Sequence, residues 1–220
     1  MTNFTRGGTW GHLRGQGFWN DEACTGAHTF TIEWEIPQGD PSGEAPLQMP
    51  GTNHWYQVVR APMSFDSARA VADVAVFQSM QGHLVTVTSA EEAAFVGNLA
   101  PDTALWLAGR DVSTDGTRKF VWVDGPETGQ PITTCTDRTG SGTCRNVGYA
   151  NWESSGEPNN WLGIENCIHV NWAHFQGYGP RGGWNDIMCD RTQPSGAGVY
   201  GLYGFIIEFE PGVQNTDSQL

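Results

Sequence analysis

Three short clusters of oxygen-bearing side chains constrain this chain more than any other feature. Glu157-Pro158-Asn159 comes first, Glu165-Asn166-Cys167 follows, and Trp184-Asn185-Asp186 stands beyond a glycine-rich stretch, with Cys189 close behind. The clusters supply carboxylates and carboxamides, and no histidine or free thiolate belongs to the pattern. Hard cations such as calcium bind six to eight oxygens, whereas zinc and copper favour nitrogen and sulfur. The pattern therefore favours calcium.

The proline of the first cluster adds a local constraint. An X–Pro peptide bond adopts the cis form at modest cost. A cis Glu157–Pro158 bond would turn Glu157 and Asn159 to the same side of the chain. Any one of the three tripeptides alone is better explained without a site, as a polar turn or as a buried tryptophan beside a turn.

In this order, and with the cysteines placed as they are, the clusters resemble the C-type lectin-like domain in its calcium- and sugar-binding form. The resemblance implies an α+β fold in which two helices flank mixed and antiparallel sheets and a long loop region carries the calcium site. It implies five side-chain ligands to one calcium ion: Glu157, Asn159, Glu165, Asn185 and Asp186.

The resemblance also implies a class of sugar. In the family, the Glu-Pro-Asn order goes with glycans that have equatorial 3- and 4-hydroxyls, such as mannose, glucose and N-acetylglucosamine, with fucose also accommodated. Glu157, Asn159, Glu165 and Asn185 would then contact the sugar as well as the ion. Trp161 is a further candidate, either for stacking on a pyranose ring or for local packing.

The charge of this ligand set suits a divalent cation. Glu157, Glu165 and Asp186 sum to −3, so we expect them to repel one another until an ion of charge +2 binds. A second calcium ion is common in the family, but Asn160 and Asn166 stand where carboxylates often sit. The charge available to a second ion is therefore small.

Cysteine placement implies two disulfides. The family resemblance pairs Cys167 with Cys189, and Cys135 and Cys144 bracket a short loop that a local bridge would close. Cys24 is left over. Such pairing favours an oxidising compartment, and hence a secreted or cell-surface protein, although no signal peptide is visible after Met1. The outer disulfide of the family is missing, because Phe77 and Ile207 occupy its positions.

The chain divides unevenly along its 220 residues. Residues 1–35 resemble the end of the main domain. Both segments contain Trp-Asn-Asp, a cysteine three residues after the aspartate, and a closing strand of aromatic and apolar residues. We interpret them as the remnant of an upstream repeat. Residues 36–50 are predicted to be a linker, 51–211 a complete domain, and 212–220 a disordered tail. Ser64 and Ser89 are predicted to cap two helices.

Composition and charge limit the classes of binding partner that this chain can have. The net charge of −13 makes nucleic acid and anionic membranes poor partners, and no apolar run approaches the roughly 20 residues of a membrane span. We find no metalloprotease or serine-hydrolase motif, and Glu157 and Glu165 cannot act as a glycosidase pair while both bind a cation. The leading prediction is a non-enzymatic, calcium-dependent carbohydrate-binding protein, multivalent through neighbouring repeats. The alternative is a protein-binding or adhesive domain in which calcium is only structural.

Overall fold

The computed structural model describes residues 9–14, 18–23, 44–153, 156–177, 179–190 and 202–212. The chain forms two compact units, residues 1–35 and residues 36–220. In the first unit, β1 (Thr9–Arg14) pairs antiparallel with β2 (Phe18–Ala23), which contains the first Trp-Asn-Asp. That this unit is the remnant of a repeat stays a prediction, and Cys24 lies outside the described residues.

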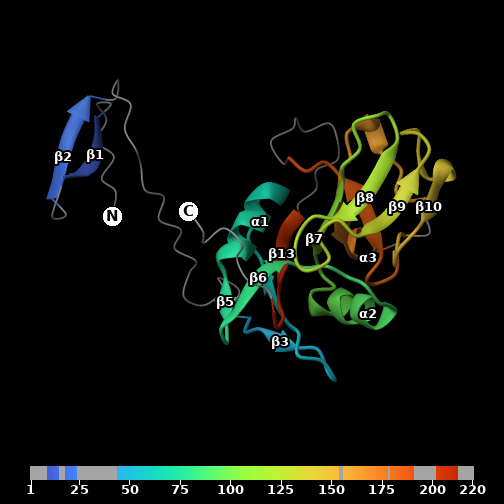
Figure 1. Cartoon of the computed structure of the whole chain (residues 1–220), viewed down its shortest axis with the longest axis horizontal. Coiled ribbons are helices and arrows are strands. Elements are labelled where there is room, and N and C mark those ends of the chain that lie inside the picture. The colour runs from blue at the N-terminus through green and yellow to red at the C-terminus, as the bar shows by residue number, and fades with distance from the viewer. Residues whose placement is uncertain are drawn as a thin grey trace. The chain divides into compact units, whose positions relative to one another are not determined.

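The second unit carries the remaining elements (Figure 1). Its strands are β3 (Leu47–Gln48), β4 (Trp55–Val59), β5 (Val76–Phe77), β6 (Met80–Leu84), β7 (Ala104–Asp111), β8 (Arg118–Trp122), β9 (Pro131–Cys135), β10 (Cys144–Asn146), β11 (Cys167–Val170), β12 (Trp184–Ile187) and β13 (Leu202–Phe209). Its helices are α1 (Phe65–Val74), α2 (Ala90–Leu99) and α3 (Trp172–Phe175), with two 3-10 turns, η1 (Ser141–Thr143) and η2 (Trp161–Gly163).

Both predicted helix caps are present. The Ser64 side chain accepts a hydrogen bond from the Ser67 backbone at the start of α1, and the Ser89 side chain accepts one from the Glu92 backbone at the start of α2. These bonds satisfy backbone donors that the first helical turn leaves without partners. Glu92 reaches one residue further back than a capping box requires, to the backbone nitrogen of Thr88 at 2.7 Å.

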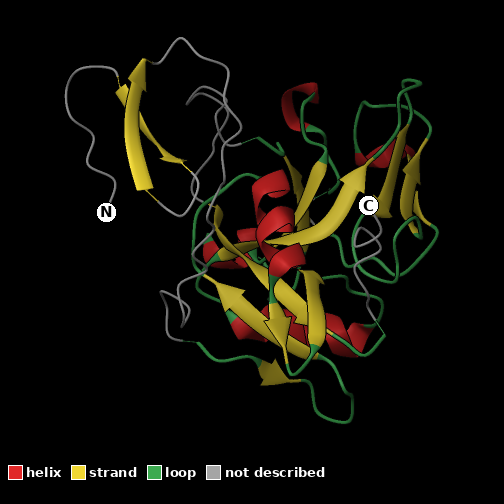
Figure 2. Ribbon diagram, turned by 60° about the vertical axis from the view of Figure 1, so that its left-hand side comes forward, coloured by secondary structure: helices red, strands yellow, loops and turns green. Residues whose placement is uncertain are grey.

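The strands form a mixed sheet around β13, in the order β10-β9-β8-β7-β13-β4-β3, and β11, β12, β5 and β6 join it off this path. β13 runs parallel to β7 and antiparallel to β4 and β6. Figure 2 shows the helices in red against these strands in yellow. Strands and helices from distant parts of the chain thus share one core, which confirms the α+β fold. None of the helices in the described part of the chain is long and apolar enough to cross a bilayer.

Tryptophan packing and disulfide bonds connect this core to the long loop region. Trp184 in β12 is fully buried and makes edge-on contacts with Trp122 and Trp152, at ring distances of 5.6 and 6.0 Å. The expected disulfides Cys167–Cys189 and Cys135–Cys144 are both present. The first ties β11 to the segment after β12, so the ends of these strands are held by packing and by a covalent bond.

Candidate functional site

The Glu-Pro-Asn loop has the local geometry that the sequence predicts. The Glu157–Pro158 peptide bond is cis. Glu157 accepts from both nitrogens of Asn159: the side-chain amide donates to Oε1 at 2.8 Å, and the backbone N–H donates to Oε2 at 2.9 Å. The two polar side chains therefore face each other, with a donor and an acceptor side by side.

Asp186 fastens this loop to β12. Its side chain is fully buried, and its two oxygens accept from the backbone N–H groups of Asn159 at 2.8 Å and Asn160 at 3.0 Å. β12 in turn pairs with β11, where Asp186 lies opposite Ile168. The sheet and the Cys167–Cys189 bridge thus determine where Asp186 lies, and Asp186 determines where the loop lies.

Glu165 lies at the other end of the same loop. It is buried, its Oε2 accepts from the Trp161 backbone at 2.7 Å, and its own backbone N–H donates to Asn160 Oδ1 at 3.2 Å. Left-handed backbone at Asn160 and Leu162 closes the turn between them. The structure therefore brings Asp186 of β12 to the loop that carries Glu157 and Glu165.

Negative charge is crowded in this region. Burial raises the pKa of Glu157 to about 8, and the charge of Asp186 adds to the effect. Burial and the charge of Asp186 likewise raise the pKa of Glu165 to about 8. Both shifts have the sign expected of carboxyl groups that share a partly desolvated site, and a bound cation would oppose them.

Arg118 is the principal site residue that sequence reasoning missed. Its guanidinium is fully buried and donates to Asp186 Oδ2 at 2.7 Å, to Asp111 Oδ2 at 3.2 Å and to the Glu165 carbonyl. The expected sum of −3 counts only the ligands; Arg118 adds a positive charge in direct contact with Asp186, which it shares with Asp111. No spacing rule points to this residue, which is 68 positions from Asp186.

A second arginine, Arg138, contacts Asn160 and Asn166, the two asparagines considered above for a second ion. Arg138 donates to Asn166 Oδ1 at 2.6 Å and pairs with Asp111 at 3.0 Å. The Asn160 side-chain amide donates to the Arg138 carbonyl at 2.8 Å. Asn160 and Asn166 are therefore engaged in contacts within the protein, and the charge near them is already balanced by a guanidinium.

The remaining predicted ligands fit a calcium ion. Asn185 is buried in β12, and its Oδ1 is among the few buried side-chain oxygens that have no hydrogen-bond partner in the described part of the chain. A buried amide oxygen without a partner costs free energy that an ion would recover. The donor set consists of carboxylate and amide oxygens, as calcium requires. Trp161 is beside the site, and 45% of it is exposed.

The comparisons with known proteins agree with this fold. The model of the family described as lectin C-type domain matches residues 74–195, more than half of the chain. The chain therefore belongs to the C-type lectin domain family.

Individual relatives match stretches of different length. It is 34% identical over 167 residues to halomucin of Haloquadratum walsbyi, a match that covers 76% of this chain and 2% of halomucin. It is 30% identical over 123 residues to ladderlectin of Oncorhynchus mykiss, covering 54% of this chain and 50% of ladderlectin. Among solved structures, the chain is similar to the C-type carbohydrate-recognition domain of cow CD23, solved in the presence of a GlcNAc2Man3 oligosaccharide. The TM-score is 0.45 and the sequence identity 22%, and the match covers 71% of this chain and 88% of that chain. The chain thus spans at most half the length of these two curated relatives.

Proposed function

We propose that this protein binds carbohydrates in a calcium-dependent manner, without enzymatic activity, through Glu157, Asn159, Glu165, Asn185 and Asp186. The observation that carries the proposal is the convergence of Glu157, Asn159, Glu165 and Asp186 around one loop. Asn185 precedes Asp186 in β12, and its Oδ1 is buried and without a partner among the described residues. Calcium would supply positive charge to the carboxylates and open coordination positions to sugar hydroxyls.

The chain's own residues define what kind of hydroxyl fits. A bound hydroxyl needs an acceptor for its proton and a donor for its remaining lone pair. Glu157 offers only acceptors, and the Asn159 side-chain amide offers donors from the adjacent position. With Glu165 and Asn185 on the other side, a pair of neighbouring hydroxyls would meet an acceptor and a donor at each end. We infer the mannose class, with equatorial 3- and 4-hydroxyls, from this Glu-then-Asn order.

One ion is the expected stoichiometry. Arg118 donates to Asp186, and Arg138 donates to Asn166, so a positive charge of the protein already lies beside each of these residues. A second cation next to them would meet two guanidinium groups, and the repulsion would outweigh the contribution of the neutral amides.

The apolar surface beside the site extends this proposal. Trp161, Leu162 and Ile164 are 45%, 62% and 40% exposed. Trp161 also donates its backbone N–H to Glu165, so its position is linked to the ion site. We expect its indole to stack on a sugar ring, and the neighbouring aliphatic groups to contact the apolar part of a larger glycan.

Exchanging the donor and the acceptor tests the sugar assignment. The double variant Glu157→Gln with Asn159→Asp keeps the summed charge of the ligands but reverses which side of each hydroxyl meets a donor. We expect calcium binding to survive and binding of free mannose to become undetectable. A hydrogen bond to a charged group contributes about 1.5–3 kcal/mol, whereas millimolar affinity is about 4 kcal/mol in total.

The assay is calorimetric titration of monomeric protein with free mannose, with and without a chelator, because multivalent display hides weak sites. Glu91→Gln with Gln176→Glu is a matched control, since both residues are exposed, outside the loop, and the net charge is again unchanged. If the Glu157 and Asn159 double variant binds mannose as the parent does, these residues do not recognise the sugar. The exposed apolar residues would then favour the alternative of a protein-binding domain with structural calcium.

Two wider proposals follow from the same features. Two disulfides in the described residues favour an oxidising environment, so we propose an extracellular or cell-surface location. If residues 1–35 are the end of another repeat, neighbouring domains would bind glycans multivalently.

A further inference from the structure

A second cluster of ligand-type side chains lies on the β4–β13–β6 part of the sheet. β13 lies between β4 and β6, where Glu208 is opposite Tyr56 on one side and His83 on the other. Side chains two residues apart on a strand share a face, and Glu210 follows Glu208 at that spacing. His54 directly precedes β4. The pairing of three strands therefore brings two histidines and two glutamates together.

The nitrogens of His54 each face a carboxylate. Nδ1 is 2.8 Å from Glu208 Oε1, and Nε2 is 3.6 Å from Glu210 Oε2. A neutral imidazole has one N–H and one lone pair, so it donates to only one of these carboxylates. At the other ring nitrogen, a lone pair faces a carboxylate oxygen. That arrangement is repulsive unless a proton or a metal ion lies between the two atoms.

His83 holds the second carboxylate without competing for this position. Its Nδ1 is 3.0 Å from the Leu84 carbonyl and its Nε2 is 3.1 Å from Glu210 Oε1, so both ring nitrogens face acceptors. His83 therefore orients Glu210, and Thr86 orients Glu208 through its backbone N–H at 3.2 Å.

The charges and the space around the cluster both suit a divalent ion. Glu208 and Glu210 place two carboxyl groups beside the His54 imidazole. Next to it is a cavity of about 160 Å³ that is lined by His54 and Glu208 and by two further carboxylates, Glu92 and Glu127. His54 is about one-third exposed, so an ion can reach the cluster from solvent.

We propose that His54, Glu208 and Glu210 form a binding site for a divalent transition-metal ion of the zinc type, separate from the calcium and carbohydrate site. One ligand atom from each residue lies within 4.8 Å of the others, the only such trio of histidine, cysteine, aspartate or glutamate in the part of the chain that the structure describes. Zinc bonds to nitrogen and oxygen are about 2.0–2.2 Å, so only a small contraction places all three around one ion.

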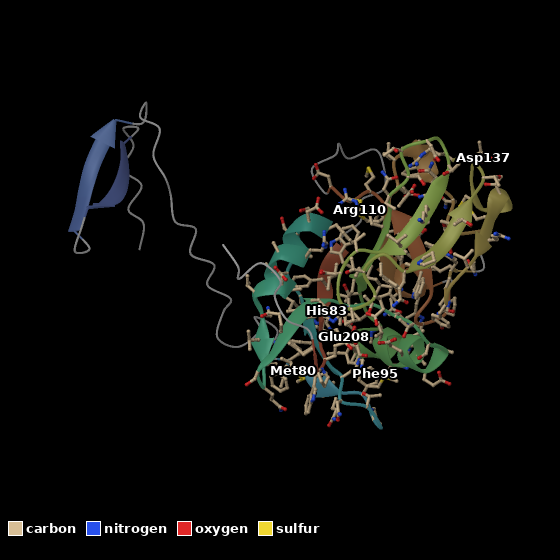
Figure 3. The ribbon with its side chains drawn as sticks, in the orientation of Figure 1. Met80, His83, Phe95, Arg110, Asp137 and Glu208 are labelled. Atoms are coloured by element: carbon tan, nitrogen blue, oxygen red, sulfur yellow. A yellow bond between two sulfur atoms is a disulfide. The ribbon has the colours of Figure 1, made fainter. Side chains whose placement is uncertain are left out.

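The coordination has one nitrogen and two oxygens, with a further position open toward the cavity. Imidazole is a ligand that zinc favours and calcium does not, which distinguishes this cluster from the all-oxygen loop site. Figure 3 shows His83 and Glu208 close together, well separated from Asp137, which precedes the site residue Arg138. The two sites are thus spatially independent.

The test is calorimetric titration of the full chain with Zn²⁺ in saturating calcium, which keeps zinc out of the loop site. We expect one zinc ion whose binding weakens by more than about tenfold in His54→Gln and in Glu210→Gln, because even the loss of a residue that only orients a ligand costs roughly 10–100-fold. Cobalt in place of zinc adds a spectroscopic readout, since the visible absorption bands of Co²⁺ depend on its ligands and should change in His54→Gln.

Matched controls separate this cluster from other histidines. His174→Gln removes a partly buried imidazole outside it, and the pair His12→Gln with His28→Gln removes two in the first unit; both should bind zinc as the parent does. Melting curves without zinc establish that each variant is folded. If the parent takes up no zinc, or if His54→Gln and Glu210→Gln bind it with unchanged affinity, the proposal is wrong. Mannose binding should be unaffected by either substitution, so a failure here is distinct from a failure of the carbohydrate site.

Discussion

Arg118 is both a structural support and a competitor of the calcium ion, and Arg118→Met separates the two roles. In calcium-free buffer we expect the variant to be less stable. Removing one partner of a buried ion pair typically costs about 3–5 kcal/mol, because the other charge is left uncompensated. For Arg118→Met we expect a loss of free energy of unfolding near the lower end of this range. Asp186 keeps two backbone donors, and Asp111 keeps Arg138 at 3.0 Å.

The loss converts into a measurable shift in melting temperature. For a domain of roughly 150–250 residues, 1 kcal/mol corresponds to about 2–4 °C, so a loss of about 3 kcal/mol lowers the midpoint by about 6–12 °C. Calcium should reverse part of the loss. Without the guanidinium, Asp186 has no cation beside it, so the ion binds more tightly. Each tenfold gain in calcium affinity adds about 1.4 kcal/mol of stability at saturating ion.

The assay is thermal and urea denaturation of parent and variant, each in chelator and in about 10 mM calcium. In the parent, a site with extracellular affinity should gain about 1.4–2.7 kcal/mol from that calcium. Arg69→Met is the control, because its partner Asp124 is 3.4 Å away near the surface and such pairs contribute about 0–1 kcal/mol. Equal stability of parent and Arg118→Met in chelator, or a smaller calcium effect in the variant, would refute the reasoning.

Three further predictions address protonation and cysteine chemistry. Because the pKa values of Glu157 and Glu165 are raised to about 8, the native protein binds more protons than the unfolded chain between about pH 4.5 and 8. Their contribution to the free energy of unfolding without calcium should therefore fall as pH rises through that window. Calcium affinity should rise over the same window, by about tenfold per pH unit for each proton displaced, in titrations at pH 6, 7 and 8. His169 is fully buried with neither ring nitrogen hydrogen-bonded, so His169→Phe should raise the free energy of unfolding by about 1–3 kcal/mol in urea denaturation; an unchanged midpoint would show that the imidazole is satisfied in solution. Intact-mass thiol counting without reduction should find one reactive thiol, Cys24; a bridge from Cys24 to Cys135 or Cys144 would contradict the interpretation of residues 1–35.

The fold and the two disulfides were accessible from sequence because their signals are local. Ser64 and Ser89 each cap a helix within three residues of themselves. Cys135 and Cys144 are nine positions apart, and their strands are adjacent. A reader of the sequence needs only short-range patterns and a family resemblance to place these features.

The electrostatics of the site were not accessible in the same way. Arg118 begins β8 and reaches Asp186 in β12, 68 positions away, through a contact that only the folded chain creates. The sequence gives no periodicity for such a contact, so a charge count of the predicted ligands alone overstated the repulsion. The His54 cluster was missed for the same reason. It depends on the alignment of β4, β13 and β6, and its members are spread from residue 54 to residue 210.

Arg118 and Arg138 also explain how the loop region stays ordered around a site of like charges. Asp186 accepts from two backbone N–H groups of the loop and from Arg118, and Arg138 links Asp111 to Asn166. These contacts are made between groups of the protein itself and attach the loop to β8 and β12. The pKa values of Glu157 and Glu165, by contrast, are raised by burial and by the charge of Asp186, and Asn185 Oδ1 has no partner among the described residues. Calcium should therefore act chiefly on these three residues, so that its binding energy goes into completing the sugar-binding surface rather than into folding the domain.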